Sequence, residues 1–204
     1  DPPYDLTSGK RGGSGLASVN LESPYGRARI GTGNGGGFMG IHAATDTLKN
    51  QKAYGDMIGA VFTQHPWGPK DTVMIKVEDP GHALAKGVFE KDEFKFNDEI
   101  YEFREPYDRK RLHVILSLDL AKSDKPNRPV RRTDGDYPIA WTRSHGQGRV
   151  FYCSLGHAIS TFADPTVLKF WLRGIQFAAG DIDAETAGRE SPTSSQVSYC
   201  MPET

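Results

Sequence analysis

Residues 35–46, GGGFMGIHAATD, decide the fold that this sequence predicts. Three glycines lead into the short apolar segment 38–41, which has the character of a buried strand. The segment ends abruptly at His42, and the small residues Ala43 and Ala44 follow it. A sharp strand-to-helix turn of this kind exposes the residue at its tip, as in the nucleophile elbow. The alternative is a histidine that only caps a core strand through a backbone hydrogen bond.

The rest of the chain alternates strand and helix patterns. Val73, Ile75 and Val77 alternate as in a strand, and residues 111–120 form an apolar strand-like run. Residues 139–154 predict a hairpin that turns at 144–148. Strands that alternate with helices before a hairpin indicate an α/β fold with an antiparallel excursion at one edge of the sheet.

The segment 164–180 has the strongest helix pattern in the chain. Asp164 suits the N-cap, Pro165 the first helical position and Gly180 the C-terminal end. The predicted apolar face consists of Val167, Leu168, Phe170, Trp171, Ile175 and Phe177. We therefore expect this helix to pack on the sheet.

The composition limits the classes of partner. The 204 residues suffice for one domain with a real core, and 25 basic residues nearly balance 26 acidic ones. A net charge of -1 argues against binding nucleic acid or an anionic membrane surface. No apolar run approaches the ~18 residues of a membrane helix, so no membrane insertion is expected. The chain begins with Asp1 rather than Met, and its compartment, cytoplasmic or exported, stays open.

The ends of the chain differ from its centre. Residues 1–34 are rich in Gly and polar residues and predict loop with at most one short strand, and 181–204 predict a polar tail. The folded domain is therefore expected over 35–180. A buried, inert Cys153 is favoured over a disulfide with Cys200 or a nucleophilic thiol.

A second histidine repeats the arrangement at His42. The strand 149–154 leads to His157, and Gly156 before it gives the backbone room. His65 lies beside Pro66 and Trp67, where the indole could form a wall of a binding site. Asp98 and Glu99 end an alternating segment next to Tyr101. We expect His42, His65, His157 and a carboxylate to converge at one rim of the sheet, and the other histidines, His82, His113 and His145, to be structural or surface residues.

Imidazoles at such a rim suit two kinds of chemistry. They transfer protons near neutral pH, or they ligate zinc or another divalent metal. Local spacing gives the metal little support, because the chain has no HxxxH or HxH pattern. His42, His65 and His157 are the candidate ligands, and no cofactor is certain.

Six motifs in order resemble the ThuA-like domain, which is named for a trehalose-utilisation protein. They are GGGFMGIHAATDT, HP, DEIYEF, HVILSLD, PIAWTRSHGQGRVFYCSLGH and LRGIQFAAG, and they cover roughly residues 34–180. The resemblance implies the flavodoxin-like sandwich of class I glutamine amidotransferases, with a mainly parallel sheet. His42 stands where those amidotransferases carry a cysteine, so glutamine hydrolysis by a thiolate is not expected. ThuA-like domains usually begin with further strands, and the first loop often contributes a histidine that is missing here.

The resemblance implies carbohydrate chemistry, on disaccharides or glycosides oxidised to 3-keto sugars. His42 and His157 would then act as base and acid, with Glu99 as the third catalytic residue. Asp46, His65, Trp67 and Tyr101 would contact the substrate. The second hypothesis is a non-catalytic sugar-binding or scaffold module on the same fold. The partner is a small carbohydrate in both cases, and a homo-oligomer stays open.

Overall fold

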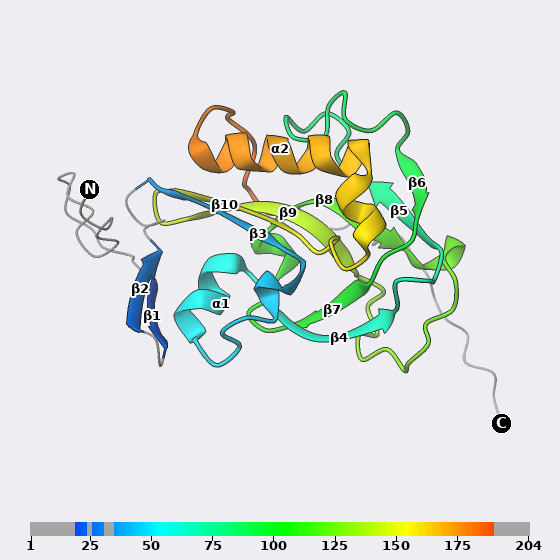
Figure 1. Ribbon diagram of the computed structural model, residues 1–204, viewed down its shortest axis with the longest axis horizontal. Coiled ribbons are helices and arrows are strands. Elements are labelled where there is room, and N and C mark those ends of the chain that lie inside the picture. The colour runs from blue at the N-terminus through cyan, green and yellow to red at the C-terminus, as the bar shows by residue number, and fades with distance from the viewer. Residues whose placement is uncertain (1–18, 24–25, 31–34, 190–204) are drawn as a thin grey trace.

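The computed structural model describes residues 19–23, 26–30 and 35–189 (Figure 1). A six-stranded sheet forms the centre of the molecule, in the order β3-β10-β9-β8-β5-β6. Its strands are β3 (Gly37–Ile41), β5 (Val73–Val77), β6 (Glu93–Phe96), β8 (His113–Asp119), β9 (Pro138–His145) and β10 (Gly148–Cys153). A separate antiparallel pair consists of β4 (Val61–Trp67) and β7 (Ile100–Arg104).

The α/β layered class is confirmed, whereas the strand directions differ from the expected mainly parallel sheet. In the described six-stranded sheet β3 and β10 run parallel, and the other four neighbouring pairs run antiparallel. The hairpin β9–β10 lies inside the sheet rather than at its edge, because β3 pairs with the outer side of β10. That pairing sets Ile41 beside Cys153, so both strands end at the same point.

Helices cover both faces of the sheet. The helix α2 (Pro165–Ala179) lies on one face, and α1 (Lys52–Ile58) lies on the other with the β4–β7 pair (Figure 1). Successive side chains of β10 point to opposite faces of the sheet, so the strand contributes to two hydrophobic cores. Phe151 packs in the core on the α2 side, and Tyr152 packs in the core on the α1 side. Short 3₁₀ turns are η2 (His42–Thr45), η3 (Arg109–Arg111), η4 (Leu120–Lys122) and η5 (Ile159–Ala163).

The helix α2 confirms the prediction for residues 164–180. The Asp164 carboxylate accepts hydrogen bonds from the amides of Thr166 and Val167, and Gly180 ends the helix in the left-handed conformation. The buried stripe is Val167, Phe170, Trp171, Gly174 and Phe177. Leu168 and Ile175 were expected on this face but are exposed, as is Leu172, because these three lie on the opposite side of the helix.

Both terminal regions hold more structure than the sequence predicted. The strands β1 (Val19–Ser23) and β2 (Gly26–Ile30) pair as an antiparallel hairpin where at most one strand was expected. After α2, the segment 181–189 lies on the domain instead of leaving it as a polar tail. We call residues 181–189 the C-terminal strap; residues 190–204, including Cys200, fall outside the described residues.

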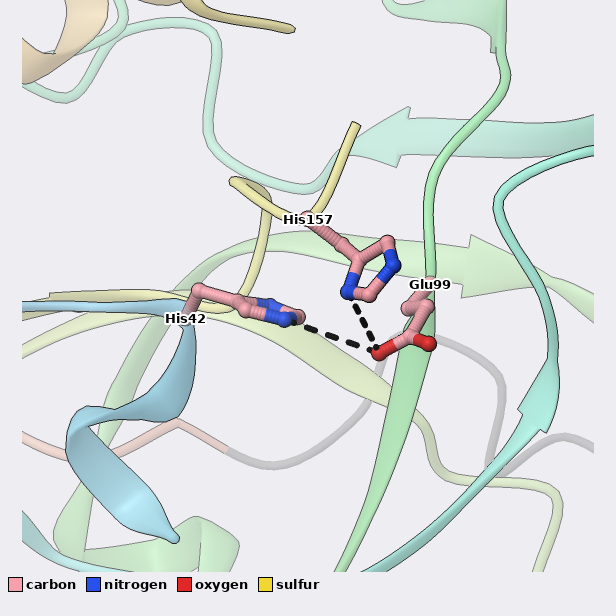
Figure 2. A group of neighbouring side chains, drawn as sticks. All are labelled: His42, Glu99 and His157. Carbon is pink, nitrogen blue, oxygen red and sulfur yellow. Dashed lines mark ion pairs between the residues drawn. The ribbon is translucent and has the colours of Figure 1, made fainter. Parts of the chain in front are cut away.

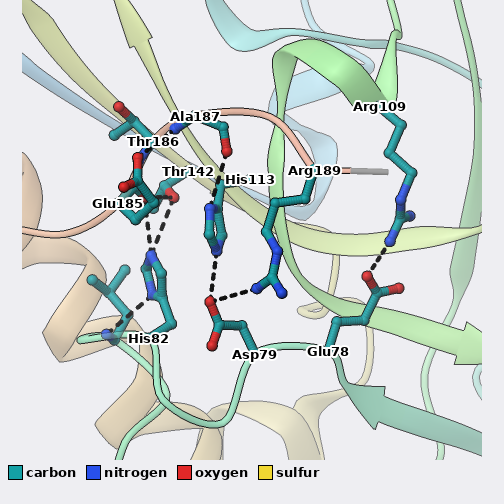
Figure 3. A network of polar contacts seen from close by, with 11 residues as sticks. Glu78, Asp79, His82, Arg109, His113, Thr142, Glu185, Thr186, Ala187 and Arg189 are labelled. Atoms are coloured by element: carbon teal, nitrogen blue, oxygen red, sulfur yellow. Dashed lines mark hydrogen bonds and ion pairs between the residues drawn. The ribbon is translucent and has the colours of Figure 1, made fainter. Parts of the chain in front are cut away.

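Two buried histidines hold the strap (Figure 3). His82 Nε2 lies 3.0 Å from the Glu185 carbonyl oxygen, and His113 Nδ1 lies 3.1 Å from that of Ala187. The Arg189 guanidinium donates to Asp79 Oδ2 at 2.7 Å. His82 and His113 are therefore structural, as the sequence indicated.

Candidate functional site

The strand β3 ends in a strained turn at His42. This residue has φ of +44°, a left-handed conformation that side chains other than glycine rarely adopt, and the 3₁₀ turn η2 starts there. The Tyr152 hydroxyl donates to the His42 carbonyl oxygen at 2.8 Å, and the Tyr54 hydroxyl donates to that of Ala44 at 2.9 Å. The structure therefore confirms the predicted elbow and shows two buried tyrosines that hold it.

The loop after β10 packs directly on this elbow. Gly156 has φ of +137°, and a Cβ there would lie 2.9 Å from Ile41 Cγ2 and 3.3 Å from His42 Cβ. Only a glycine lets the loop approach so closely. The imidazole centroids of His42 and His157 consequently lie 5.4 Å apart, so these two predicted residues do meet.

Asp98 fixes the position of that loop. Its carboxylate is fully buried and accepts hydrogen bonds from the backbone amides of Gly156, His157 and Ala158 at 2.8–3.1 Å. The Thr161 hydroxyl donates to it at 2.7 Å, and the Glu99 amide does so at 2.8 Å. One carboxylate thus holds both the loop that carries His157 and the backbone of Glu99.

Glu99 lies at the centre of the cluster (Figure 2). Its Oε2 atom lies 3.5 Å from His42 Nε2 and 3.3 Å from His157 Nδ1. The other oxygen, Oε1, lies 3.5 Å from His65 Nδ1. Glu99 is buried, whereas 46% of the His157 side chain is exposed, so the cluster opens to solvent on the His157 side.

The hydrogen bonds of His42 indicate its tautomer. Nδ1 lies 2.7 Å from the Ser154 carbonyl oxygen, an acceptor, so Nδ1 carries the proton. Nε2 lies 2.8 Å from the Tyr101 hydroxyl. Burial raises the pKa of Tyr101, and the charges of Glu99, Asp46 and Asp98 raise it further. The hydroxyl therefore stays protonated, and it can donate to Nε2 when that nitrogen carries a lone pair.

His65 reaches the same carboxylate from β4. Its side chain is 28% exposed and lies in a stacked arrangement with Phe62. Its Nδ1 atom is buried and has no hydrogen-bond partner among the described residues, although it lies 3.5 Å from Glu99 Oε1. This nitrogen is an unsatisfied polar atom at the edge of the cluster.

The structure shows other partners for three of the predicted substrate contacts. Trp67 is completely buried, and its Nε1 donates to the Asp124 carbonyl oxygen at 2.7 Å, so it offers no face to a sugar. Tyr101 is only 4% exposed and orients His42 instead of stacking on a ligand. Asp46 is exposed and forms an ion pair with Lys49 one turn away. Its link to the cluster is the effect of its charge on Tyr101.

Sequence reasoning missed several supporting residues. Asp98 has no predicted role in the site, although its place before a strand and next to a candidate catalytic carboxylate is a signal. Tyr152 and Ser154 lie in a strand that looks purely structural, and no local pattern distinguishes them. Cys153 is buried and free, and burial raises the pKa of its thiol to about 12, which agrees with the inert role expected.

Fold and site together define a layered α/β protein of the flavodoxin-like type with a histidine at its elbow. The trehalose-utilisation family, ThuA, matches residues 29–178, more than half of the chain. This chain belongs to the ThuA family, as its motifs indicated.

Solved structures show the same fold. A ThuA-like protein from Bacteroides uniformis is 26% identical with a TM-score of 0.55, over 72% of this chain and 60% of that one. A ThuA-like protein from Parabacteroides merdae is 18% identical with a TM-score of 0.53, over 79% of this chain and 65% of that one. This chain therefore spans less than two thirds of either relative. No curated protein matches it.

The structure also bears on membranes. Among the described residues, no helix has the length and apolar character needed to cross a bilayer.

Proposed function

We propose that this protein acts on disaccharides or glycosides, in the form of 3-keto sugars, at the cluster of His42, Glu99 and His157. The observation that carries the proposal is the position of the Glu99 carboxylate, whose Oε2 lies within 3.5 Å of a nitrogen of both imidazoles. Residues from three distant segments meet there, and the open side at His157 gives a ligand access.

The chemistry follows from the substrate class. A keto group acidifies the neighbouring C–H bond, so a base of the cluster can remove that proton. The electrons of the C–H bond then form a carbon–carbon double bond, and the glycosidic C–O bond breaks. The departing oxygen takes a proton from a second group of the cluster. His42 and His157 would share these two roles with Glu99 between them, or a metal ion at the same centre would polarise the keto oxygen.

The residues that surround the cluster hold its side chains in place, as a catalytic site requires. Ser154 and Tyr101 fix the orientation of the His42 ring, and Asp98 fixes the loop of His157. Groups held by buried partners need little reorganisation during reaction, which favours catalysis over loose binding. His65 is the remaining residue that we propose to contact substrate, through the part of its side chain that is exposed.

The test is turnover of trehalose and of its 3-keto derivative by the full chain and by two variants. Glu99→Gln and His157→Ala should each lower kcat by about 100-fold or more on the keto sugar. The His157 side chain is half exposed, so its removal should change the free energy of unfolding by less than about 1 kcal/mol. The matched control is His145→Ala at the tip of the β9–β10 hairpin, which should keep full activity.

Two outcomes would contradict the proposal. Full turnover by both variants would place the reaction elsewhere. Binding of the sugar without turnover, at an affinity that neither variant changes, would instead support a sugar-binding module that uses another surface.

A further inference from the structure

We infer that His42, Glu99 and His157 form a binding site for one divalent transition-metal ion, of which Zn²⁺ is the type. The inference rests on the proposed function only for the ion's role, because the ligand set follows from geometry. One ligand atom from each residue can be chosen so that all three lie within 4.8 Å of one another. Figure 2 shows both imidazole rings directed at the same carboxylate oxygen.

The distances fit a tetrahedral ion. Two ligand atoms that each lie about 2.0–2.2 Å from a tetrahedral zinc ion are roughly 3.3–3.5 Å apart. The Glu99 Oε2 contacts with His157 Nδ1 and His42 Nε2, at 3.3 and 3.5 Å, match this spacing. The remaining pair of ligand atoms, on His42 and His157, lies within 4.8 Å, and the half-exposed His157 ring is the one free to move closer.

The donor set and its surroundings suit the same ion. Two imidazoles and one carboxylate are the protein ligands of several catalytic zinc sites, which leave a fourth position for water or substrate. The His42 Nδ1–H group donates to the Ser154 carbonyl oxygen at 2.7 Å, which directs the Nε2 lone pair into the cluster. Metal-bound histidines almost always show this outer hydrogen bond. The open position would lie on the exposed His157 side.

The charge at the centre points to a cation. Glu99 is buried, and within the described part of the chain its ion-pair partners are three histidines, with no lysine or arginine. The His42 nitrogen that faces it carries a lone pair when the ring is neutral. A divalent ion between these groups neutralises the carboxylate and uses the lone pairs.

The ion gives the proposed chemistry a definite form. It would polarise the keto oxygen of the sugar, and the two imidazoles would then be ligands. The C–H proton would pass instead to His65, the histidine of the cluster that does not hold the ion. Binding would replace the hydrogen bond that His42 Nε2 accepts from Tyr101. His65 is not a ligand in this arrangement, and its unsatisfied Nδ1 stays beside the second oxygen of Glu99.

The test is calorimetric titration of the chelator-treated full chain, free of any affinity tag, with Zn²⁺, together with the visible spectrum of its Co²⁺ form. We expect one ion per chain and a tetrahedral Co²⁺ spectrum. Glu99→Gln and His157→Ala should each weaken binding at least ~10-fold, while Tyr101→Phe, which removes a competitor for Nε2, should not weaken it. Glu90→Gln and His145→Ala, matched changes at residues outside the cluster, should leave it unchanged.

The results separate the two proposals. Absence of stoichiometric binding, or equal binding by Glu99→Gln and the wild type, would overturn the metal site, even if the chain turns over keto sugars without metal. Stoichiometric binding that needs Glu99 and His157, in a chain without sugar turnover, would support the site and contradict the proposed function.

Discussion

At the scale of single residues, the site depends on two backbone conformations that are unusual. His42 has a left-handed φ that presents its ring at the end of β3, and Gly156 has a positive φ that lets the next loop touch it. The conformation of His42 costs roughly 1–3 kcal/mol and persists because the surrounding contacts hold it, whereas a glycine adopts a positive φ readily. Together the two conformations bring the rings of His42 and His157 to the same point.

Gly156→Ala should separate the two histidines. The added Cβ would meet Ile41 Cγ2 at 2.9 Å in a conformation that alanine disfavours, so we expect the free energy of unfolding to fall by about 2 kcal/mol or more. Zinc or sugar affinity should fall as well, because the loop must move away from the elbow. Urea unfolding and calorimetry measure the two effects.

Gly87→Ala is the matched control for this change. Gly87 also has a positive φ, of +69°, but a Cβ there would have open space within 4 Å. It should therefore show only the backbone cost of about 1 kcal/mol and unchanged affinity. An equal loss of stability in both variants would show that the contact with Ile41 has no effect.

The residues that sequence alone could identify were those next to strand ends. His42, Glu99 and His157 follow or precede apolar runs, and parallel pairing of β3 with β10 brings the two histidines together. The burial of Trp67 and Tyr101 could not be predicted, because it depends on the separate β4–β7 pair and on the distant Asp124. Aromatic residues near a predicted site are as well suited to packing as to sugar binding.

At the scale of elements, Asp98 acts as the joint between β7 and the loop 156–161. Five donors surround its buried carboxylate, and four of them belong to that loop. Residues 154–158 belong to no helix or strand, so these hydrogen bonds decide where His157 lies.

Asp98→Asn should loosen the loop although it keeps the shape of the side chain. An amide group replaces one accepting oxygen by a donor, which then faces donors such as the Gly156 amide. We expect a loss of about 1–3 kcal/mol in the free energy of unfolding. NMR relaxation of the His157 ring should also show greater mobility. Thr161→Val, which removes only one of the five donors, should cost no more than about 1.5 kcal/mol and leave the ring ordered.

The elements themselves were predictable to different degrees. The helix 164–180 has its start and stop signals within the sequence, and it formed between those residues. The order and direction of the strands depend on partners far along the chain, as when β3 pairs with β10 more than a hundred residues away. Local patterns cannot decide such pairings. For this reason the sequence predicted a mainly parallel sheet, whereas the sheet is mixed.

At the scale of the whole molecule, the C-terminal strap ties the chain end back to the sheet. Glu185 lies over Thr142 of β9, whose hydroxyl donates to the Glu185 carbonyl oxygen at 2.7 Å. His82 donates to the same oxygen, and Ala187 lies against His113 (Figure 3). The polar composition of the strap concealed this packing, because backbone carbonyl groups make many of its contacts. Only two apolar side chains of the strap, Ile182 and Ala184, pack against the core.

The strap makes stability depend on the protonation of His82. Its Nε2–H donates to Glu185, and its Nδ1 accepts from the Leu84 amide at 3.2 Å, so the ring must be neutral. Burial lowers the pKa of His82, with further lowering by the neighbouring His113, and this outweighs the raising effects of the hydrogen bond to Glu185 and of the charges of Asp79 and Glu185. The unfolded chain then binds the proton more readily than the folded one.

Stability should therefore be complete above the ordinary histidine pKa of about 6.5 and fall as the pH drops toward 5. The uptake of one proton on unfolding lowers the free energy of unfolding by at most about 1.4 kcal/mol for each unit by which the pH falls. Urea unfolding at pH 7.5 and 5.5 measures the fall, and His82→Asn, which has no group that titrates in this range, should make it smaller. His145 also has a pKa lowered by burial and by nearby arginines, so His145→Ala is the parallel measurement. If His82→Asn shows the same pH dependence as the wild type, protonation of His82 does not cause the loss of stability, and the prediction is wrong.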